Sequence, residues 1–345
     1  MEKTILVTGG TGYIGAWVVK KLLDKGYKVI LTLRNKSKIQ SLVFLKEISE
    51  KFAEKIEFVE ADLLKEGDFD EPASRSDAII HVASPFKLTF KDPVAELINP
   101  AVKGTQNVLN AANKSERVKK VVLTSSVAAV HGDNKDMTEL GIEEFTEENF
   151  NQTSSVKHQP YSFSKVTAEK EAWKIAEQQD KWKLVVINPS FVMGPSLVGA
   201  TNSGSFSFMT DLLSGKYSMA APELYFGFVD VRDVAEAHIL ALENDDAEGR
   251  HILSVGVMNI KQLSDLIEKL YPNRFKLPKA KAPKFLLLMI GWSFGLTTKF
   301  VSRNIGWPLK LSNKKSIEKL GLKYAPTEKI FKDMIDYMIE NKIIN

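Results

Sequence analysis

A short apolar run that ends in a glycine cluster, with a helical pattern directly behind it, constrains the fold of this chain most. Residues 4–15 read Thr-Ile-Leu-Val-Thr-Gly-Gly-Thr-Gly-Tyr-Ile-Gly. The glycines match both G-x-G-x-x-G and G-x-x-G-x-x-G, where one permits a tight turn, one admits a pyrophosphate and one lets the helix pack close to the strand. A glycine-rich turn without a ligand is the alternative. We predict a dinucleotide site whose members here are Gly9, Thr11, Gly12, Tyr13, Ile14 and Gly15.

Strand and helix patterns alternate through the first half of the chain, which is typical of a parallel sheet with helices on both faces. We expect strands near 3–8, 28–34, 56–60, 78–82, 119–124 and 183–188, and helices near 13–25, 37–53, 91–114, 160–180 and 231–243. The fold class is therefore α/β, a Rossmann-type doubly wound parallel sheet with a smaller C-terminal substrate-binding lobe. We assign residues 1–190 and 225–257 to the sheet domain, and 191–224 and 258–345 to the lobe.

Composition excludes several kinds of site. The chain has 345 residues and no cysteine, which rules out disulfides, thiolate metal sites and a cysteine nucleophile, and which fits the cytoplasm. The five histidines show no metal-ligand spacing, so we expect no metal. The first strand pattern begins at once, so we expect no cleavable signal peptide, and the longest apolar run is too short to span a membrane. No nucleic-acid partner is expected.

Positive charge is concentrated near the C-terminus. Residues 273–317 hold ten lysines and arginines and no acidic residue, although the whole chain has a net charge of only +4. A solvated lysine-rich surface, an anionic substrate and an acidic membrane surface each fit this pattern. Within it, residues 285–292 predict a buried helix of the lobe, with a membrane-surface or partner-binding helix as the alternative.

The end of the second predicted strand indicates which nicotinamide cofactor binds. An Asp or Glu about twenty residues past the glycines is typical of NAD sites. Arg34 stands at that place, with Lys36 and Lys38 just behind it. A guanidinium can clamp a 2′-phosphate, so we predict NADP(H), with a solvated basic turn as the alternative. Further cofactor contacts are expected after the third and fourth strands: Asp62, Leu63, Ala83 and Ser84.

Tyr161 and Lys165 form a Y-x-x-x-K pair in the first turns of a predicted helix, where positions i and i+4 share a face. The motif alone is expected once by chance in this composition, so its context carries the argument. A lysine ammonium favours phenolate, which would lower the tyrosine pKa toward the working pH of an acid or base. Ser126, after the fifth strand, is the candidate that polarises a carbonyl, and Ser125 is its competitor.

Together with Asn188-Pro189-Ser190, these motifs resemble an extended short-chain dehydrogenase/reductase. The finer resemblance, over about residues 3–260, is to the dihydroflavonol-4-reductase-like group, which includes cinnamoyl-CoA reductases and fungal methylglyoxal or ketone reductases. It implies that Ser126, Tyr161 and Lys165 are catalytic. It also implies contacts to the nicotinamide from Pro189, Ser190 and Val192. Candidate substrate contacts, besides Ser126, are Pro85, His131 and Phe206.

We therefore expect an NADPH-dependent reductase of an aldehyde or ketone, with a small-molecule carbonyl compound as its partner. A sugar-nucleotide epimerase or dehydratase is the main alternative, and a non-catalytic NADP-binding regulator is a weaker one. A homodimer that pairs the helices at 91–114 and 160–180 is also an expectation.

Overall fold

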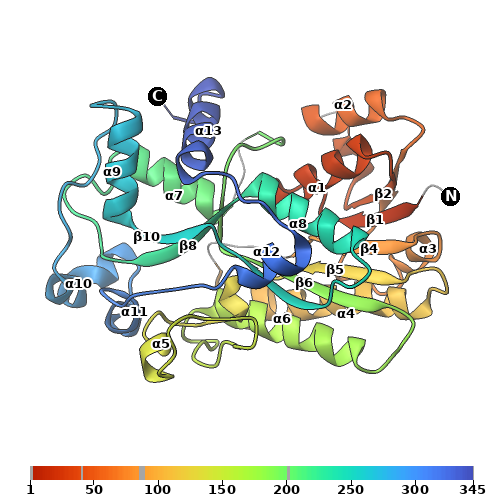
Figure 1. The fold of residues 1–345 in the computed structure, drawn as a ribbon, viewed down its shortest axis with the longest axis horizontal. Helices are drawn as coiled ribbons and strands as arrows, with labels where there is room; N and C mark the ends of the chain where they lie inside the picture. Colours follow the sequence, from red (N-terminus) through yellow and green to blue (C-terminus); the bar gives the residue numbers. More distant parts are fainter. Residues whose placement is uncertain (1–2, 40–41, 85–89, 200–202, 345) are drawn as a thin grey trace.

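Seven parallel strands form the centre of the molecule (Figure 1). The computed structural model describes residues 3–39, 42–84, 90–199 and 203–344. The strand order is β3-β2-β1-β4-β5-β6-β9, which reverses direction beside β1 as in a doubly wound sheet. The strands are β1 Thr4–Thr8, β2 Lys28–Leu33, β3 Ile56–Glu60, β4 Ala78–His81, β5 Lys120–Thr124, β6 Lys183–Pro189 and β9 Gly249–Leu253.

Helices cover both faces of this sheet (Figure 1). Helix α1 packs against α8 on one face, and α4 packs against α6 on the other. The helices of this part are α1 Tyr13–Asp24, α2 Val43–Lys51, α3 Asp70–Ser74, α4 Asn99–Lys114, α5 Asp136–Glu139, α6 Pro160–Ala176 and α8 Val231–Glu243. Residues Lys36–Lys38 and Val127–Ala129 form short 3₁₀ helices, and Val94–Ile98 form a π-helical turn directly before α4.

The inner strands of the sheet are mostly apolar because both of their faces are buried, whereas the edge strand β3 carries two exposed glutamates. In β1, Ile5 and Val7 join the core shared with α1 and α8, while Leu6 joins the core on the other face. The expected strands are confirmed to within a residue or two. The helix expected over 37–53 is wrong in extent, because Lys36–Lys38 form a separate short turn and α2 starts only at Val43.

A second, smaller structure contains most of the remaining elements. Strand β8 pairs in parallel with β7 and antiparallel with β10. Its elements are β7 Phe191–Met193, α7 Gly204–Leu213, β8 Tyr225–Asp230, β10 Gly256–Asn259, α9 Ile260–Leu270, α10 Lys284–Ile290, α11 Thr298–Asn304 and α13 Thr327–Glu340, with a tight helical turn at Gly291–Phe294. Helix α12, Lys314–Leu320, packs instead on β9 and α8 of the large-sheet part. The segment 225–257, which we assign to the sheet domain, contributes to both sheets. Its α8 and β9 belong with the large sheet, whereas β8 and the start of β10 belong to the small one. The proposed domain boundaries stay a prediction.

One sequence expectation about this lobe is wrong. The helix predicted to be buried at 285–292 forms, as α10 and the turn behind it, but Leu287 is the only buried side chain of α10. Phe285 is 68% exposed and Trp292 is 77% exposed. The apolar residues of this segment predict burial, but the neighbouring elements of the lobe bury only one side chain of α10.

Candidate active site

The carboxyl ends of the central strands meet at one edge of the sheet, and polar side chains tie them together there. Thr8 at the end of β1 lies with its Oγ1 2.6 Å from Nδ1 of His81 at the end of β4. Thr124 at the end of β5 lies with its Oγ1 2.6 Å from Nε2 of His238 in α8. Burial lowers the pKa of His81 to about 3 and that of His238 to about 4, so both imidazoles are neutral. The predicted site residues that follow these strands share this edge.

The glycine loop joins β1 to α1 by a turn in which larger residues do not fit. Gly9 adopts a left-handed conformation with φ of +74°, and a Cβ there would lie 2.6 Å from the amide nitrogen of Ala83. A Cβ on Gly15 would lie 2.1 Å from the carbonyl oxygen of Gly9, so the helix start packs directly on the turn. Gly12 is different: a Cβ there would meet only the Gly9 oxygen, at 3.3 Å. The space beside Gly12 is therefore not filled by other groups of the protein.

The N-terminus of α1 has the features of an anion site. Gly12 occupies the position that caps the helix, with no side-chain hydrogen bond, and the first turn has no acidic residue. Amide groups at such a helix start favour negative charge. The loop therefore fits the pyrophosphate of a dinucleotide, as the sequence predicts. The side chain of Tyr13 is buried, and its hydroxyl donates to the carbonyl oxygen of Gly194, 2.6 Å away. A contact of Tyr13 with the cofactor stays a prediction.

Arg34 follows β2 directly and is exposed. Within the described residues it forms no ion pair, so its guanidinium remains available to a phosphate. The side chain of Lys38 and the whole of Pro85 lie outside the described residues. Asp62 is exposed after β3, and one of its carboxylate oxygens accepts a hydrogen bond from the amide of Leu64 at 2.9 Å. That bond caps the turn that follows β3, and a contact of Asp62 with the cofactor stays a prediction.

The three predicted catalytic residues come together. A side-chain hydrogen bond joins Tyr161 to Ser126. Lys165 lies one turn further along α6, with its Nζ 5.9 Å from the centre of the Tyr161 ring. The same Nζ donates to the hydroxyl of Ser84, 3.1 Å away, at the end of β4. The serine, tyrosine and lysine thus form one cluster, which touches a predicted cofactor contact.

The electrostatics of this cluster differ from the sequence expectation. Burial raises the pKa of Tyr161 to about 12, and the hydrogen bond with Ser126 opposes this only in part. Burial also lowers the pKa of Lys165 to about 8, although the nearby Glu169 carboxylate favours its charged form. The expected lowering of the tyrosine pKa is therefore absent without cofactor, because both groups are removed from water. Tyr161 is a phenol at neutral pH, as a proton donor must be.

Ser125, the other candidate to polarise a carbonyl, is bonded to a buried carboxylate instead. Its hydroxyl donates to the carboxylate of Glu169, and both side chains are buried. Asn188 donates to the same carboxylate at 2.8 Å and to the backbone oxygen of Ser126 at 3.2 Å. Glu169 lies in α6 one turn beyond Lys165, so this network fixes the base of the cluster. Sequence reasoning missed Glu169, although the i+4 spacing from Lys165 was a usable signal.

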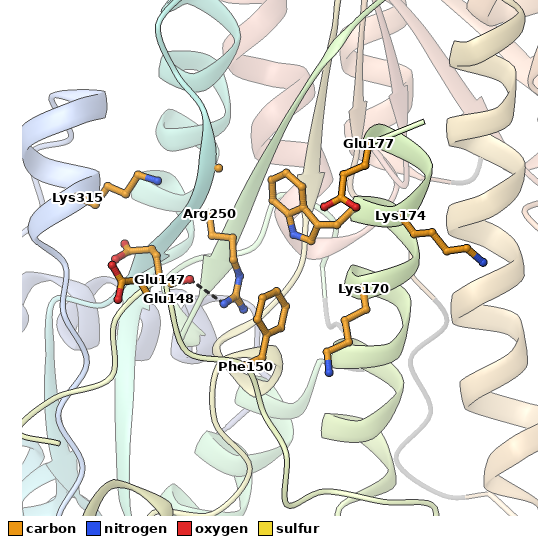
Figure 2. Close-up of a pocket in the computed structure, with 10 residues that line it drawn as sticks. Glu147, Glu148, Phe150, Lys170, Lys174, Glu177, Arg250 and Lys315 are labelled. Atoms are coloured by element: carbon orange, nitrogen blue, oxygen red, sulfur yellow. Dashed lines mark hydrogen bonds between the residues drawn. The ribbon is translucent and has the colours of Figure 1, made fainter. Parts of the chain in front are cut away.

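Arg250 neutralises Glu169. Its Nε lies 2.5 Å from the Glu169 carboxylate, and both side chains are at most 5% exposed. Its guanidinium stacks 3.9 Å from the ring centre of Phe150 and donates to the Glu147 carbonyl oxygen (Figure 2). The open pocket drawn in Figure 2 also has Lys170 among its lining residues, but none of Ser126, Tyr161 and Lys165 is among them. It is a surface pocket that borders α6 and is lined mainly by charged residues.

The residues expected near the nicotinamide lie in and after β6. Pro189 ends that strand, and Val192 lies in β7. Ser190 between them is buried, and its hydroxyl has no hydrogen-bond partner among the described residues. Ala83 donates its amide to the hydroxyl of Thr8 at 3.2 Å. These positions border the same sheet edge as Lys165, and their contacts to a cofactor stay predictions.

Two of the candidate substrate contacts have clear surroundings. His131 stacks on Phe145 with ring centres 4.8 Å apart, and burial lowers its pKa to about 4. Its Nδ1 is buried and has no hydrogen-bond partner in the part of the chain that the structure describes. Phe206 is only 2% exposed and contacts Tyr13 edge-on, with ring centres 5.1 Å apart. Phe206 is therefore a core residue of the lobe.

A buried carboxylate ties the lobe to the segment that precedes Tyr161. Asp133 is fully buried and accepts hydrogen bonds from His158 at 2.9 Å and from Asn304 at 2.6 Å. Arg303 lies with its Nε 2.6 Å from the same carboxylate, and like Asn304 it belongs to α11. The positive charge of Arg303 is thus paired with a carboxylate inside the protein. Within the described residues, no group of three or more acidic or histidine side chains is arranged to hold a metal.

Comparison with known proteins identifies a matching family and relatives along most or all of the chain. The family described as NAD dependent epimerase/dehydratase matches residues 5–256. A cinnamoyl-CoA reductase of Medicago truncatula is 36% identical over 351 residues, covering 100% of this chain and 98% of the relative. An anthocyanidin reductase of Vitis vinifera is 34% identical over 288 residues, covering 80% and 83%.

Solved structures with similar folds are found as well. Gre2 of Candida albicans in complex with NADPH is 32% identical with a TM-score of 0.78, over 98% of this chain and 99% of that one. A UDP-glucose 4-epimerase of Thermotoga maritima, at 24% identity and a TM-score of 0.73 over 98% and 99%, shares the fold. The chain therefore belongs to the NAD-dependent epimerase/dehydratase family, the extended short-chain dehydrogenases/reductases. Its sequence relatives named here are dihydroflavonol-reductase-like reductases, so the predicted resemblance is confirmed.

Proposed function

We propose that this protein is an NADPH-dependent reductase of aldehydes or ketones that works through Ser126, Tyr161 and Lys165. The observation that carries the proposal is the cluster itself: a Tyr161–Ser126 hydrogen bond with Lys165 on the same face of α6. The named relatives are reductases, and the one in complex with NADPH supports the choice of cofactor.

NADPH, when bound, supplies the hydride that reduces the carbonyl carbon. The uncapped start of α1 and the space at Gly12 would hold its pyrophosphate, and Arg34 would hold its 2′-phosphate. Ser126 would orient the carbonyl oxygen by a hydrogen bond. Tyr161 would donate its phenolic proton to that oxygen, which turns the developing alkoxide into an alcohol.

Lys165 stabilises the phenolate that remains after this proton transfer, because an ammonium favours a nearby anion. Glu169 and Asn188 hold the cluster from behind, so the three groups keep one geometry. The lobe of residues 191–224 and 258–345 would close the substrate side, as the proposed domain division implies. We further propose a cytoplasmic enzyme, in keeping with the absence of cysteine, and a homodimer through α4 and α6.

The decisive test compares two reactions. Purified protein is incubated with NADPH and a panel of aldehydes and ketones, and in parallel with UDP-sugars without added reductant. NADPH oxidation on a carbonyl compound supports the reductase. UDP-sugar interconversion without any carbonyl turnover would instead establish the epimerase, and cofactor binding without either reaction would leave only the regulator.

Replacing Arg34 by aspartate should invert the cofactor preference. The change removes charge-assisted hydrogen bonds and places a carboxylate against the 2′-phosphate, so NADPH should bind about a hundredfold more weakly, equivalent to about 3 kcal/mol. NADH affinity should change little. Titration of both cofactors by protein fluorescence measures this, with Arg274→Asp as the matched control at an exposed arginine. Equal losses for NADPH and NADH would show that Arg34 is not the clamp.

The pH profile of carbonyl reduction should report the state of Lys165. Its ammonium is present below its pKa of about 8 and is lost above it, so kcat/KM should fall about tenfold per pH unit above that value. Tyr161, with its pKa raised to about 12, stays protonated across this range. In Lys165→Arg, whose side chain keeps its charge, residual activity should lack this fall. A wild-type profile that stays level up to the ordinary lysine pKa of about 10.4 would contradict the assignment.

A further inference from the structure

The exposed apolar surface of this protein is concentrated in one short segment. Of the large apolar side chains that the described residues leave exposed, half belong to residues 285–292. Phe285, Met289 and Trp292 are 68%, 69% and 77% exposed. The segment comprises α10 and the turn behind it, at the end of the molecule remote from the seven-stranded sheet (Figure 1). Exposed apolar side chains gathered in this way mark an interaction site.

Residues 285–292, called the ridge below, leave most of their apolar side chains exposed. Leu287 is the one side chain of α10 that is buried, in a small cluster with Val301 and Ile305. At 100° per residue, the exposed side chains of Phe285, Leu286, Leu288, Met289 and Ile290 cover roughly 200° of the helix circumference. A helix that docks in a protein groove presents one narrow apolar stripe. A ridge that is apolar over such a wide arc instead suits a medium that surrounds it, such as the headgroup region of a bilayer.

The charge around the ridge indicates which kind of surface it meets. Residues 273–317 contain ten basic residues and no acidic one. Some of these charges are engaged: Lys281 binds Glu223, and Arg303 binds Asp133. Lys279 and Lys299 flank the ridge on either side, are exposed, and form no ion pair with another described residue. Basic residues next to an inserted apolar segment strengthen its binding to an anionic membrane.

We propose that residues 284–292 are a peripheral membrane anchor that inserts Phe285, Met289 and Trp292 into the interface of an anionic bilayer, with Lys279 and Lys299 on the lipid headgroups. No helix in the described residues is long and apolar enough to cross a membrane, which agrees with binding at the surface. The anchor uses none of the proposed catalytic residues. The proposal therefore stands or falls independently of the reductase function.

The test uses the full chain and vesicles of defined composition. Co-sedimentation is measured with phosphatidylcholine vesicles and with vesicles that also contain phosphatidylglycerol. We expect at least tenfold stronger partitioning onto the anionic vesicles, reduced by added salt. The triple variant Phe285→Ser, Met289→Ser, Trp292→Ser should lose this binding at least tenfold, and Lys279→Glu with Lys299→Glu should lose most of the preference for anionic lipid.

Met219→Ser is the matched control, since Met219 is 92% exposed on the same lobe and lies outside the ridge. It should bind vesicles like the wild type. Unchanged thermal unfolding shows that each variant is folded. Equal binding to both vesicle types, or binding that survives the triple variant, would overturn the proposal. So would the absence of vesicle binding together with self-association that the triple variant abolishes, which would identify a second copy of this chain as the occupant.

Discussion

Replacing Tyr161 by phenylalanine is expected to lower kcat for carbonyl reduction by about 10²–10⁴-fold, the usual contribution of a positioned general acid. The ring stays in place, so the packing of α6 is kept and only the hydroxyl that donates to the substrate oxygen is lost. The hydrogen bond with Ser126 is lost as well, but Ser126 is only half-buried and its hydroxyl also accepts from the amide of Ala128 at 3.1 Å. The fold should therefore tolerate the change.

Affinity for NADPH should stay near that of the wild type, because the lysine and the glycine loop are untouched. Steady-state kinetics gives kcat, and fluorescence titration gives the Kd for NADPH. Tyr27→Phe is the matched control, since the Tyr27 hydroxyl binds Glu243 on the exposed surface, remote in sequence from the cluster. If Tyr161→Phe keeps more than about a tenth of the wild-type kcat, the acid is another group.

Two glycine substitutions in the first loop should both weaken NADPH binding but differ in their effect on stability. In Gly15→Ala the new methyl group would lie 2.1 Å from the Gly9 oxygen and 2.8 Å from the Gly10 Cα, and both are backbone atoms. The loop or the helix start must shift, so we expect a loss of about 1–3 kcal/mol in the free energy of unfolding and a severe loss of NADPH binding. In Gly12→Ala the methyl group meets only the Gly9 oxygen at 3.3 Å.

Gly12→Ala should therefore unfold at nearly the wild-type temperature while binding NADPH much more weakly, because the methyl group occupies the space proposed for the pyrophosphate. Thermal unfolding and NADPH titration of the two variants separate a structural role from a ligand-binding role. Normal NADPH affinity in Gly12→Ala would remove the glycine loop from the proposed cofactor site.

The lobe is where sequence reasoning was weakest. Residues 285–292 predict a buried helix from their letters alone, yet the surrounding lobe buries only Leu287 of α10. Phe206, offered as a substrate contact, proves to be a core residue behind Tyr13. Both errors have one cause: apolar composition indicates that a side chain leaves water, but only the neighbouring elements decide whether it contacts core, ligand or another surface.

The features that the sequence determined by itself are local ones. The strand–glycine–helix junction spans twelve residues, and the tyrosine and lysine lie one helical turn apart, so backbone geometry alone places their groups. The tertiary structure alone decided the contacts of Lys165 with Ser84 and of Glu169 with Arg250, which join residues 81 positions apart in each case. It also decided the pKa values of Tyr161 and Lys165. Those values depend on burial, and burial results from the packing of segments that are distant in the chain.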